Sequence, residues 1–290
     1  SVTISDVDSL IGSTGTDTVT LADGGGSIAI SLVESLLGST DTETVTLLSS
    51  GSFAVSDIDS LIGGTGVDTV TLLGASTVSV SSIDTLISSA GGDTVTLLNA
   101  GTITMSGSVA SVTGSGGTDV LRFIDQADTA ISSVETVIGS ASSDTVTMLA
   151  GGTLHVSSIE SLTGSTDTDT VTMLAVGNIT ISDVDSLIGS TATDTVTLAA
   201  GGTSISLSRV DSLIGTTDTE TVTLLAGGSI GISAIDSLLG SAGTDTVTLL
   251  AASDLEVSAV ESVLGSTGTD TVTLLAAGHL RLSDVESLVA

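Results

Sequence analysis

The sequence contains no cysteine, no proline, no tryptophan and no tyrosine, and its only aromatic residues are Phe53 and Phe123. Without cysteine, no disulfide can stabilise the fold. Without large rings, the core has to be thin and built from the aliphatic side chains of Val, Ile, Leu and Ala. No apolar run approaches the roughly 18 residues of a membrane span, so we expect no membrane insertion.

Basic residues are almost as scarce as aromatic ones. Arg122, Arg209 and Arg281 stand against 34 acidic residues, which gives a net charge of -31. Nucleic acids and anionic membranes would repel such a chain, which excludes them as partners and leaves a cation as the natural counterpart. Because 40% of the residues are hydrophobic, the chain is not a disordered acidic tail.

One tetrapeptide, D-T-V-T or a close variant, returns throughout the chain. Its acid, called here the second acid, recurs every 25 or 26 residues, and a first acid lies nine residues before it in every copy but one. The second acids are Asp17, Glu43, Asp68, Asp93, Asp119, Asp144, Asp169, Asp194, Glu220, Asp245 and Asp270. The first acids are Asp8, Glu34, Asp59, Asp84, Glu135, Glu160, Asp185, Asp211, Asp236 and Glu261, with Glu286 opening an incomplete last copy. The chain is therefore a repeat protein, and such a period predicts a solenoid.

Each repeat carries three short runs rich in β-branched residues, which in the first copy are residues 2–5, 7–11 and 18–21. Glycine, serine and aspartate separate these runs, and none has the period of a helix. We therefore predict an all-β, parallel β-solenoid with about 11.5 coils of 25 residues and three short strands per coil. At a strand spacing of about 4.8 Å, such a rod would be roughly 55 Å long.

The repeat positions predict which side chains face inward. Val19, Leu21 and Val7 and their equivalents are apolar in every copy, and we expect each column to stack like on like in the core. The chain begins at Ser1 without a signal-peptide pattern and ends within a repeat. We expect residues 1–290 to form a single solenoid domain, with an irregular copy near residues 101–131, that is part of a longer or processed chain.

Residues 63–71, GGTGVDTVT, match the pattern G-G-x-G-x-D-x-U-x. In this stretch the chain resembles the repeats-in-toxin (hemolysin-type calcium-binding) repeats of large secreted bacterial proteins, and other copies keep some of the glycines. The resemblance implies secretion and folding that depends on Ca²⁺. The candidate calcium ligands are Asp17, Asp68, Asp93, Asp119, Asp144, Asp169, Asp194, Asp245 and Asp270.

The acids also call for a physical explanation. Stacked coils would place equivalent carboxylates about 5 Å apart, where two unit charges repel by roughly 3 kcal/mol at an effective dielectric constant of 20. The first acids are interpreted as a solvated charged edge. For the second acids two interpretations stay open, a side chain that caps its own turn or a ligand of Ca²⁺.

The two threonines of T-V-T form a further candidate surface. Regular T-x-T ladders are the pattern of ice-binding solenoids, whereas threonine is also simply a good exposed strand residue. The leucines that follow, such as Leu73 and Leu98, either turn inward or form an exposed apolar stripe. The residues proposed for an assembly face are Thr18, Thr20, Thr69, Thr71, Thr94 and Thr96.

A few residues break the pattern. Ala110 replaces a first acid, and Arg122 replaces a threonine in the same irregular copy, which we interpret as a degenerate repeat. His155 and His279 occupy different repeat positions, so they are not expected to form a metal pair.

Three classes of function follow. The first is structural: an extracellular or cell-surface stalk, or a self-assembling filament, surface-layer or biofilm-matrix segment that associates head-to-tail or laterally. The second is an adhesin module that binds Ca²⁺, ice or a cell-surface ligand. The third, an enzyme, is not expected, because acids recur in every copy and sugar-stacking aromatic residues are absent.

Overall fold

The computed structural model describes residues 1–89, 92–199 and 204–290. They form two compact units, residues 1–149 and residues 150–290. Within the described residues every regular element is a short β-strand and every pairing between strands is parallel. The prediction of an all-β, parallel β-solenoid is thereby confirmed. No helix in the described part is long and apolar enough to cross a membrane.

The strands of the first unit are β1 (Val2–Ile4), β2 (Ser9–Ile11), β3 (Thr18–Leu21), β4 (Gly26–Ser31), β5 (Ser35–Leu37), β6 (Glu43–Leu47), β7 (Gly51–Ser56), β8 (Ser60–Ile62), β9 (Asp68–Leu72), β10 (Thr77–Ser81), β11 (Thr85–Ser88), β12 (Asp93–Leu97), β13 (Gly101–Ser106), β14 (Val109–Thr113), β15 (Asp119–Phe123), β16 (Asp128–Ser132), β17 (Thr136–Ile138) and β18 (Thr145–Met148). Those of the second unit are β19 (Gly152–Ser157), β20 (Ser161–Thr163), β21 (Asp169–Met173), β22 (Asn178–Ser182), β23 (Ser186–Ile188), β24 (Thr195–Leu198), β25 (Ser204–Ser208), β26 (Ser212–Ile214), β27 (Thr221–Leu224), β28 (Gly228–Ser233), β29 (Ser237–Leu239), β30 (Asp245–Leu249), β31 (Asp254–Ser258), β32 (Ser262–Leu264), β33 (Thr271–Leu274), β34 (Arg281–Ser283) and β35 (Ser287–Val289).

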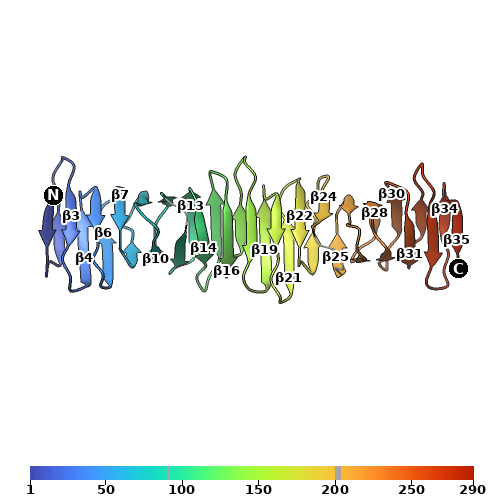
Figure 1. Ribbon diagram of the computed structural model, residues 1–290, viewed down its shortest axis with the longest axis horizontal. Coiled ribbons are helices and arrows are strands. Elements are labelled where there is room, and N and C mark those ends of the chain that lie inside the picture. Colours follow the sequence, from blue (N-terminus) through green and yellow to red (C-terminus); the bar gives the residue numbers. More distant parts are fainter. Residues whose placement is uncertain (90–91, 200–203) are drawn as a thin grey trace. The chain divides into compact units, whose positions relative to one another are not determined.

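Each turn of the solenoid contains two strands rather than three. A strand pairs with the strand two places later in the sequence, so β7 pairs with β9 and β9 with β11, while β8 pairs with β10 and β10 with β12. Odd-numbered strands build one sheet of each unit and even-numbered strands the other (Figure 1). The predicted coil of 25 residues with three strands is therefore wrong in this detail. One repeat fills one and a half turns, and the eighteen strands among the described residues of the first unit make nine turns.

Three kinds of connection join the strands, and each is named here after one example. The tight turn, residues 56–59, carries the first acid; the acid turn, residues 63–68, leads to the second acid; and the loop turn, residues 73–76, leads to the next repeat. Because three kinds of connection are spread over two ends of the sheets, each end carries them in rotation. Each acid turn therefore has two different neighbours in the stack. A loop turn from the preceding winding of the solenoid lies on one side of it, and a tight turn from the following winding lies on the other.

The same rotation mixes the strand kinds within a sheet. Val70 pairs with Phe53 on one side and with Leu86 on the other, not with the valine of a neighbouring repeat. The predicted like-on-like columns are therefore wrong, although the inward direction of these side chains is confirmed. Val70, Leu72 and Leu86 are at most 1% exposed, because alternate strand residues face the interior.

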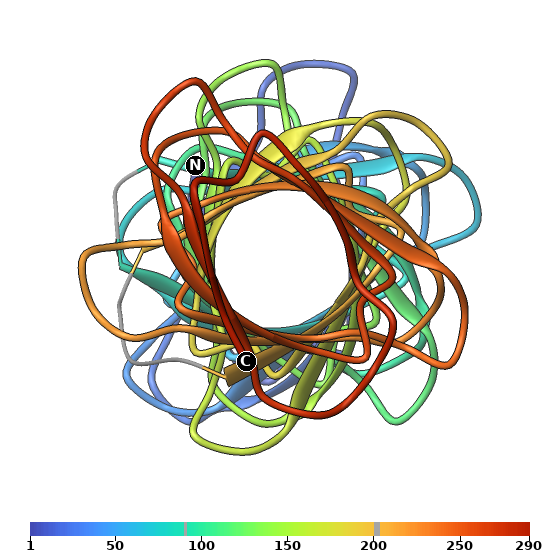
Figure 2. The ribbon, with the colours of Figure 1, turned by 90° about the vertical axis from the view of Figure 1, so that its right-hand side faces the viewer.

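The connections lie outside the strands when the chain is seen along the solenoid (Figure 2). Within each unit, loops of successive turns project in different directions in this view. Such a rotation is what the ordinary twist of β-sheets produces. The outer faces of the sheets are therefore twisted rather than flat.

A glycine of the acid turn packs against the tight turn in the next winding of the solenoid. The tight turn contains one residue with positive φ, for example Ser82 at 54°. A Cβ atom on Gly63 would lie 1.8 Å from the carbonyl oxygen of Ser82, which no side chain tolerates. Gly63 N also donates a hydrogen bond of 2.8 Å to the carbonyl oxygen of Ser81. The glycine that opens every acid turn except the one at Ser88 is therefore a requirement of packing.

Replacement of Gly63 by alanine should consequently destabilise the first unit by about 2 kcal/mol or more, because the added methyl group displaces backbone rather than a side chain. Gly74→Ala is the matched control, since its Cβ would meet no atom within 4 Å, and it should change stability by less than about 1 kcal/mol. Urea unfolding followed by circular dichroism measures both. Equal stability of the two variants would contradict this packing.

Candidate functional site

The second acids lie at the first residue of a strand or immediately before it, and from Glu43 onward their side chains are buried. Asp68 lies two residues before Val70 and four before Leu72, so the three side chains share the inner face of β9. All second acids from Glu43 onward are at most 1% exposed, whereas Asp17 is half-buried. The sequence analysis placed these acids at a turn but missed their burial. Their two-residue spacing from the buried valine was the signal that could have shown it.

Each buried carboxylate caps its own acid turn. Asp169 Oδ2 accepts hydrogen bonds from Ser165 N at 2.6 Å and Ser165 Oγ at 3.0 Å, and Asp68 Oδ2 accepts one from Gly64 N at 2.8 Å. The same contacts recur in both units, with Ser13, Ser115, Ser140, Ser241 and Ser266 as donors. The turn-capping interpretation is thus confirmed, and it explains why serine follows the glycine in most copies.

A first acid of the following turn lies beside most of the second acids, Asp93 being an exception because Ala110 occupies that position. Asp84 Oδ2 accepts a hydrogen bond of 2.9 Å from Asp68 N, across 16 residues of sequence. Equivalent bonds join Asp17 to Glu34, Glu43 to Asp59, Asp119 to Glu135, Asp169 to Asp185, Asp194 to Asp211, Glu220 to Asp236, Asp245 to Glu261 and Asp270 to Glu286. The carboxylates that become neighbours therefore belong to different columns, which corrects the expectation that equivalent acids stack 5 Å apart. The first acids are exposed, apart from the half-buried Glu135, as expected of a solvated edge.

The second oxygen divides the buried acids into two classes. In the capped acids, an amide of the preceding loop turn donates to this oxygen: Ser76 N to Asp93 at 2.7 Å, Ala127 N to Asp144 at 2.6 Å, Gly177 N to Asp194 at 3.1 Å and Ser253 N to Asp270 at 2.9 Å. In the half-capped acids, one buried oxygen has no hydrogen-bond partner among the described residues. These oxygens are Glu43 Oε2, Asp68 Oδ1, Asp119 Oδ1, Asp169 Oδ1, Glu220 Oε2 and Asp245 Oδ1.

The start of the neighbouring strand accounts for this division except at Glu220, where the described pairing starts at Ser204 opposite Thr221. Gly152, at the start of β19, pairs with Asp169, and its amide donates to the carbonyl oxygen of Thr168 at 3.1 Å instead of to the carboxylate. Gly26, Gly51, Gly101 and Gly228 pair with half-capped acids in the same register. Beside a capped acid the strand pairing starts one residue later, as at Asn178 opposite Thr195. The loop-turn amide then remains available for the carboxylate.

The two classes decide how the predicted calcium ligands fit an ion. Asp93, Asp144, Asp194 and Asp270 already use both oxygens, so they do not fit. Asp68, Asp119, Asp169 and Asp245 each keep an unpartnered buried oxygen, which fits the preference of Ca²⁺ for carboxylate ligands. Within the described ranges, no group of three or more acids or histidines is arranged to hold a metal. Carbonyl oxygens and water would have to complete the coordination of any ion.

The threonines of the proposed assembly face do not share one surface. Thr18, Thr20, Thr69 and Thr71 lie on the odd-numbered sheet in β3 and β9, while Thr94 and Thr96 lie on the even-numbered sheet in β12. Between β3 and β9 the sheet contains β5 and β7, which present serine, alanine and leucine instead. The T-x-T pairs are therefore islands rather than a continuous ladder.

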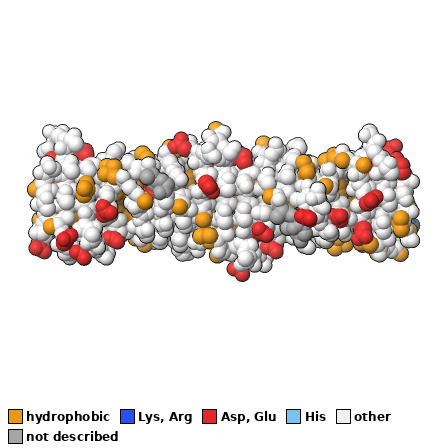
Figure 3. Space-filling model, in the orientation of Figure 1, with side chains coloured by type: hydrophobic (Ala, Val, Ile, Leu, Met, Phe, Trp, Pro, Cys, Tyr) orange, Lys and Arg blue, Asp and Glu red, His pale blue; other side chains and the backbone are white. Residues whose placement is uncertain are grey.

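Acidic residues in the described part gather at the turns, while most outward-facing strand residues are uncharged. On the face drawn in Figure 3 the acids form separate small groups along the surface. A leucine at the start of most loop turns is 48 to 57% exposed, which settles the open question in favour of exposure. These residues are Leu48, Leu73, Leu98, Leu149, Leu174, Leu225, Leu250 and Leu275. Since loop turns alternate between the two ends of the sheets, the leucines do not form one unbroken stripe.

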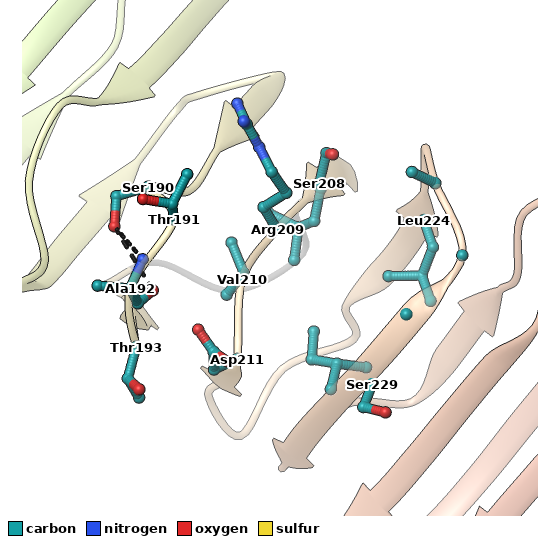
Figure 4. A pocket seen from close by; sticks show the side chains of 15 residues that line it. Ser190, Thr191, Ala192, Thr193, Ser208, Arg209, Val210, Asp211, Leu224 and Ser229 are labelled. Atoms are coloured by element: carbon teal, nitrogen blue, oxygen red, sulfur yellow. Dashed lines mark hydrogen bonds between the residues drawn. The ribbon is translucent and has the colours of Figure 1, made fainter.

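A surface hollow of the second unit lies over a tight turn and has a volume of about 400 Å³. Arg209 and Asp211 belong to this turn, and Figure 4 shows the Arg209 side chain extending away from Asp211. A second hollow of about 270 Å³ in the first unit lies at the same place in the repeat, with Asp6 in the position of Arg209. These two hollows therefore occupy equivalent tight turns, and a third of about 390 Å³ lies beside the first acid turn, at Gly12, Ser13 and Asp17. His155 lies in β19, and His279 lies between β33 and β34.

No family model matches the sequence, and no curated protein or solved structure matches it either. The resemblance to repeats-in-toxin proteins therefore stays a prediction that rests on the residues quoted for it.

The turn cap at Asp17 should be visible in its titration. The Ser13 amide and then the Ser13 hydroxyl hold the pKa of Asp17 below its ordinary value. A lowered pKa stabilises the folded state above the unfolded pKa of about 3.8, and this stabilisation is lost as the pH falls through the folded pKa. We expect Ser13→Ala to raise the pKa of Asp17 in a carboxyl ¹³C NMR titration. Thr14→Ala, in the same turn, is the control, and an equal shift in both variants would contradict the cap.

Asp68 behaves in the opposite direction. Burial raises the pKa of Asp68 and the negative charge of Asp84 adds to this shift, while the Gly64 amide opposes it and the Gly51 amide, which makes no hydrogen bond of normal geometry to Asp68, opposes it less. A raised pKa favours the folded state below about pH 3.8, and this contribution is lost as the pH rises through the folded pKa. Asp84→Asn keeps an oxygen for the Asp68 amide but removes the charge, so stability should fall less between pH 4 and neutrality. Urea unfolding across this range tests the expectation, with Asp23→Asn as control. An unchanged pH profile in Asp84→Asn would refute it.

Proposed function

We propose that the chain is a structural segment of an extracellular bacterial protein, either a stalk or a self-assembling filament, surface-layer or matrix element. The observation that supports this role is the use of the recurring acids. In nine of the acid turns the amide of the second acid donates to the first acid of the next turn, and backbone bonds such as that from Gly63 to Ser81 join the same turns. The groups that recur most often thus hold one turn to the next, which is what a scaffold requires.

The sheet faces support association between copies. Outward residues of the strands, such as Thr69, Thr71 and Ala54, carry methyl and hydroxyl groups rather than charge. Two sheet faces can therefore approach without bringing the acids of the turns into direct contact. Exposed leucines beside the strands add apolar area. Lateral association is accordingly the form of self-assembly that we favour.

An enzymatic role has no support in the described residues. The two hollows over tight turns occupy equivalent places in the repeat, and the residue at their mouth changes from Arg209 to Asp6. A catalytic centre would instead need one singular arrangement of reacting groups. Ice binding has no support either, because the T-x-T pairs are interrupted and the sheets are twisted.

Sedimentation and negative-stain imaging of the purified chain test the structural role. We expect narrow β-rich particles whose mean mass rises over a hundredfold range of concentration. Addition of arginine at the sheet faces, as in Thr69→Arg with Thr71→Arg, should suppress this rise, whereas Asp23→Asn should leave it unchanged. A particle that stays monomeric at every concentration would exclude the filament and leave the stalk. Compact round particles would overturn both.

A further inference from the structure

The outward faces of the strands are nearly uncharged, and the exceptions are few. Among the described strands, the outward side chains that can carry a charge are Arg122, Asp128, His155, Asp254, Glu256 and Arg281. On the described odd-numbered strands of the first unit, Arg122 is the one such residue. In the second unit, Asp254 and Glu256 lie on the same face of the odd-numbered strand β31. The odd-numbered sheets thus carry a cation in one unit and two adjacent acids in the other.

Arg122 lies where other copies have the second threonine of T-V-T. Thr104 of β13 and Ile138 of β17 lie opposite it in the register, so paired strands extend on both sides of it. Val120 lies two residues before it on the same face. Arg122 is exposed, and it makes no ion pair or side-chain hydrogen bond within the described ranges. These four residues, called here the β15 patch, place one free cation among methyl groups.

Glu256 has the same kind of setting with the opposite charge. Ser237 of β29 and Thr273 of β33 lie opposite it, and Asp254 lies two residues before it. Both acids are exposed and make no ion pair or side-chain hydrogen bond with any described residue. These four residues are called here the β31 patch. The chain therefore carries two exposed patches of complementary charge, each bordered by uncharged strands.

We propose that the β15 patch of one copy binds the β31 patch of a second copy, with Arg122 facing Glu256. This inference rests on the lateral association proposed above and names the residues that direct it. Contact between two faces removes water from the side chains at its centre, and a charge there is costly unless an opposite charge meets it. Contact between two β15 patches, or between two β31 patches, would instead place like charges together, which disfavours those arrangements.

The ion pair selects the arrangement of the copies rather than supplying most of the affinity. An ion pair that stays in water contributes little, so the area gained has to come from the uncharged groups around it, such as the methyl groups of Thr104 and Ile138. Within each unit the sheets are twisted (Figure 2), so two faces touch over a limited area. The charges at the centre of that area therefore decide which faces fit.

The contact joins unlike patches, and this has a consequence for assembly. Each copy that binds through one patch keeps the other patch free for a further copy. Contacts of this kind extend into open assemblies unless they close a ring. The other arginines suit the role less well, because Arg209 lies in a tight turn and Arg281 lies on β34, which pairs with β32 alone in the described part of the chain.

Exchange of the charges tests the proposal. The acidic variant carries Arg122→Glu, and the basic variant carries Asp254→Asn with Glu256→Arg. Each variant alone presents like charges at its two patches, so the concentration at which it associates should rise at least about tenfold. An equal mixture of the two variants should associate again, because each patch then meets the opposite charge. Sedimentation in 150 mM NaCl, where repulsion between the net charges is screened beyond about 8 Å, measures both effects.

Each variant has a control with the same change in charge. Arg281→Glu matches the acidic variant, and Asp128→Asn with Asp23→Arg matches the basic one. Asp128 begins an even-numbered strand and Asp23 lies in a loop turn, so both are outside the two patches. Both controls should associate as the unchanged chain does. Circular dichroism verifies that every variant is folded.

The outcomes separate this inference from the proposed structural role. If the unchanged chain associates but the acidic and basic variants do so equally well, or if mixing them restores nothing, the inference is wrong and lateral association stands. A loss of association in Arg281→Glu but not in Arg122→Glu would assign the contact to Arg281 and overturn the inference as well. An unchanged chain that stays monomeric would overturn both this inference and the self-assembly proposed above.

Discussion

The pairing of each strand with the strand two places later is the constraint on which the rest of the structure depends. The sequence repeats every three strands, whereas the solenoid closes a turn after two. Each end of the sheets therefore carries acid, tight and loop turns in rotation, and an acid turn never lies against another acid turn. The carboxylate of Asp68 meets the amides and carbonyl groups of unlike neighbours, and this is what allows an acid at the start of every third strand to be buried.

The fold class, the approximate strands and the inward columns could be predicted from local patterns. Alternation along β9 identifies Val70 and Leu72 as inward, and the structure buries both. The number of strands per turn could not be predicted, because strand pairing is a long-range property. The valine of a Thr-Val-Thr strand accepts different neighbours, as Val70 does with Phe53 on one side and Leu86 on the other. The recurring D-T-V-T tetrapeptide therefore suggested a coil of three strands, whereas each turn of the solenoid has two.

The site was predictable in part. The glycine and serine of the acid turn and the aspartate that follows imply a capped turn, which the bonds from Ser165 to Asp169 realise. The distinction between capped and half-capped acids could not be foreseen in the same way. It depends on whether one amide, such as that of Gly152 or Gly177, donates to a carbonyl oxygen or to a carboxylate. Both residues are glycines at the same distance before an acid, so composition alone does not separate them.

The irregular copy shows which parts of the repeat act together. Ser88 stands where other acid turns have glycine, and the tight turn that faces it has Gly107, with φ of 81°, and Ala110 in place of the first acid. Ser88 Oγ lies within hydrogen-bonding distance of both the Asp93 carboxylate and the carbonyl oxygen of Ser108, and its one hydrogen can bond either of them. The strand register shifts after Asp93. Ser88 lies about twenty residues before Gly107 and Ala110 in the sequence, yet these departures lie in one contact. A change in an acid turn is thus accommodated in the tight turn that lies against it in the next winding of the solenoid. These two connections together, rather than the 25-residue repeat, are therefore the structural unit of this protein.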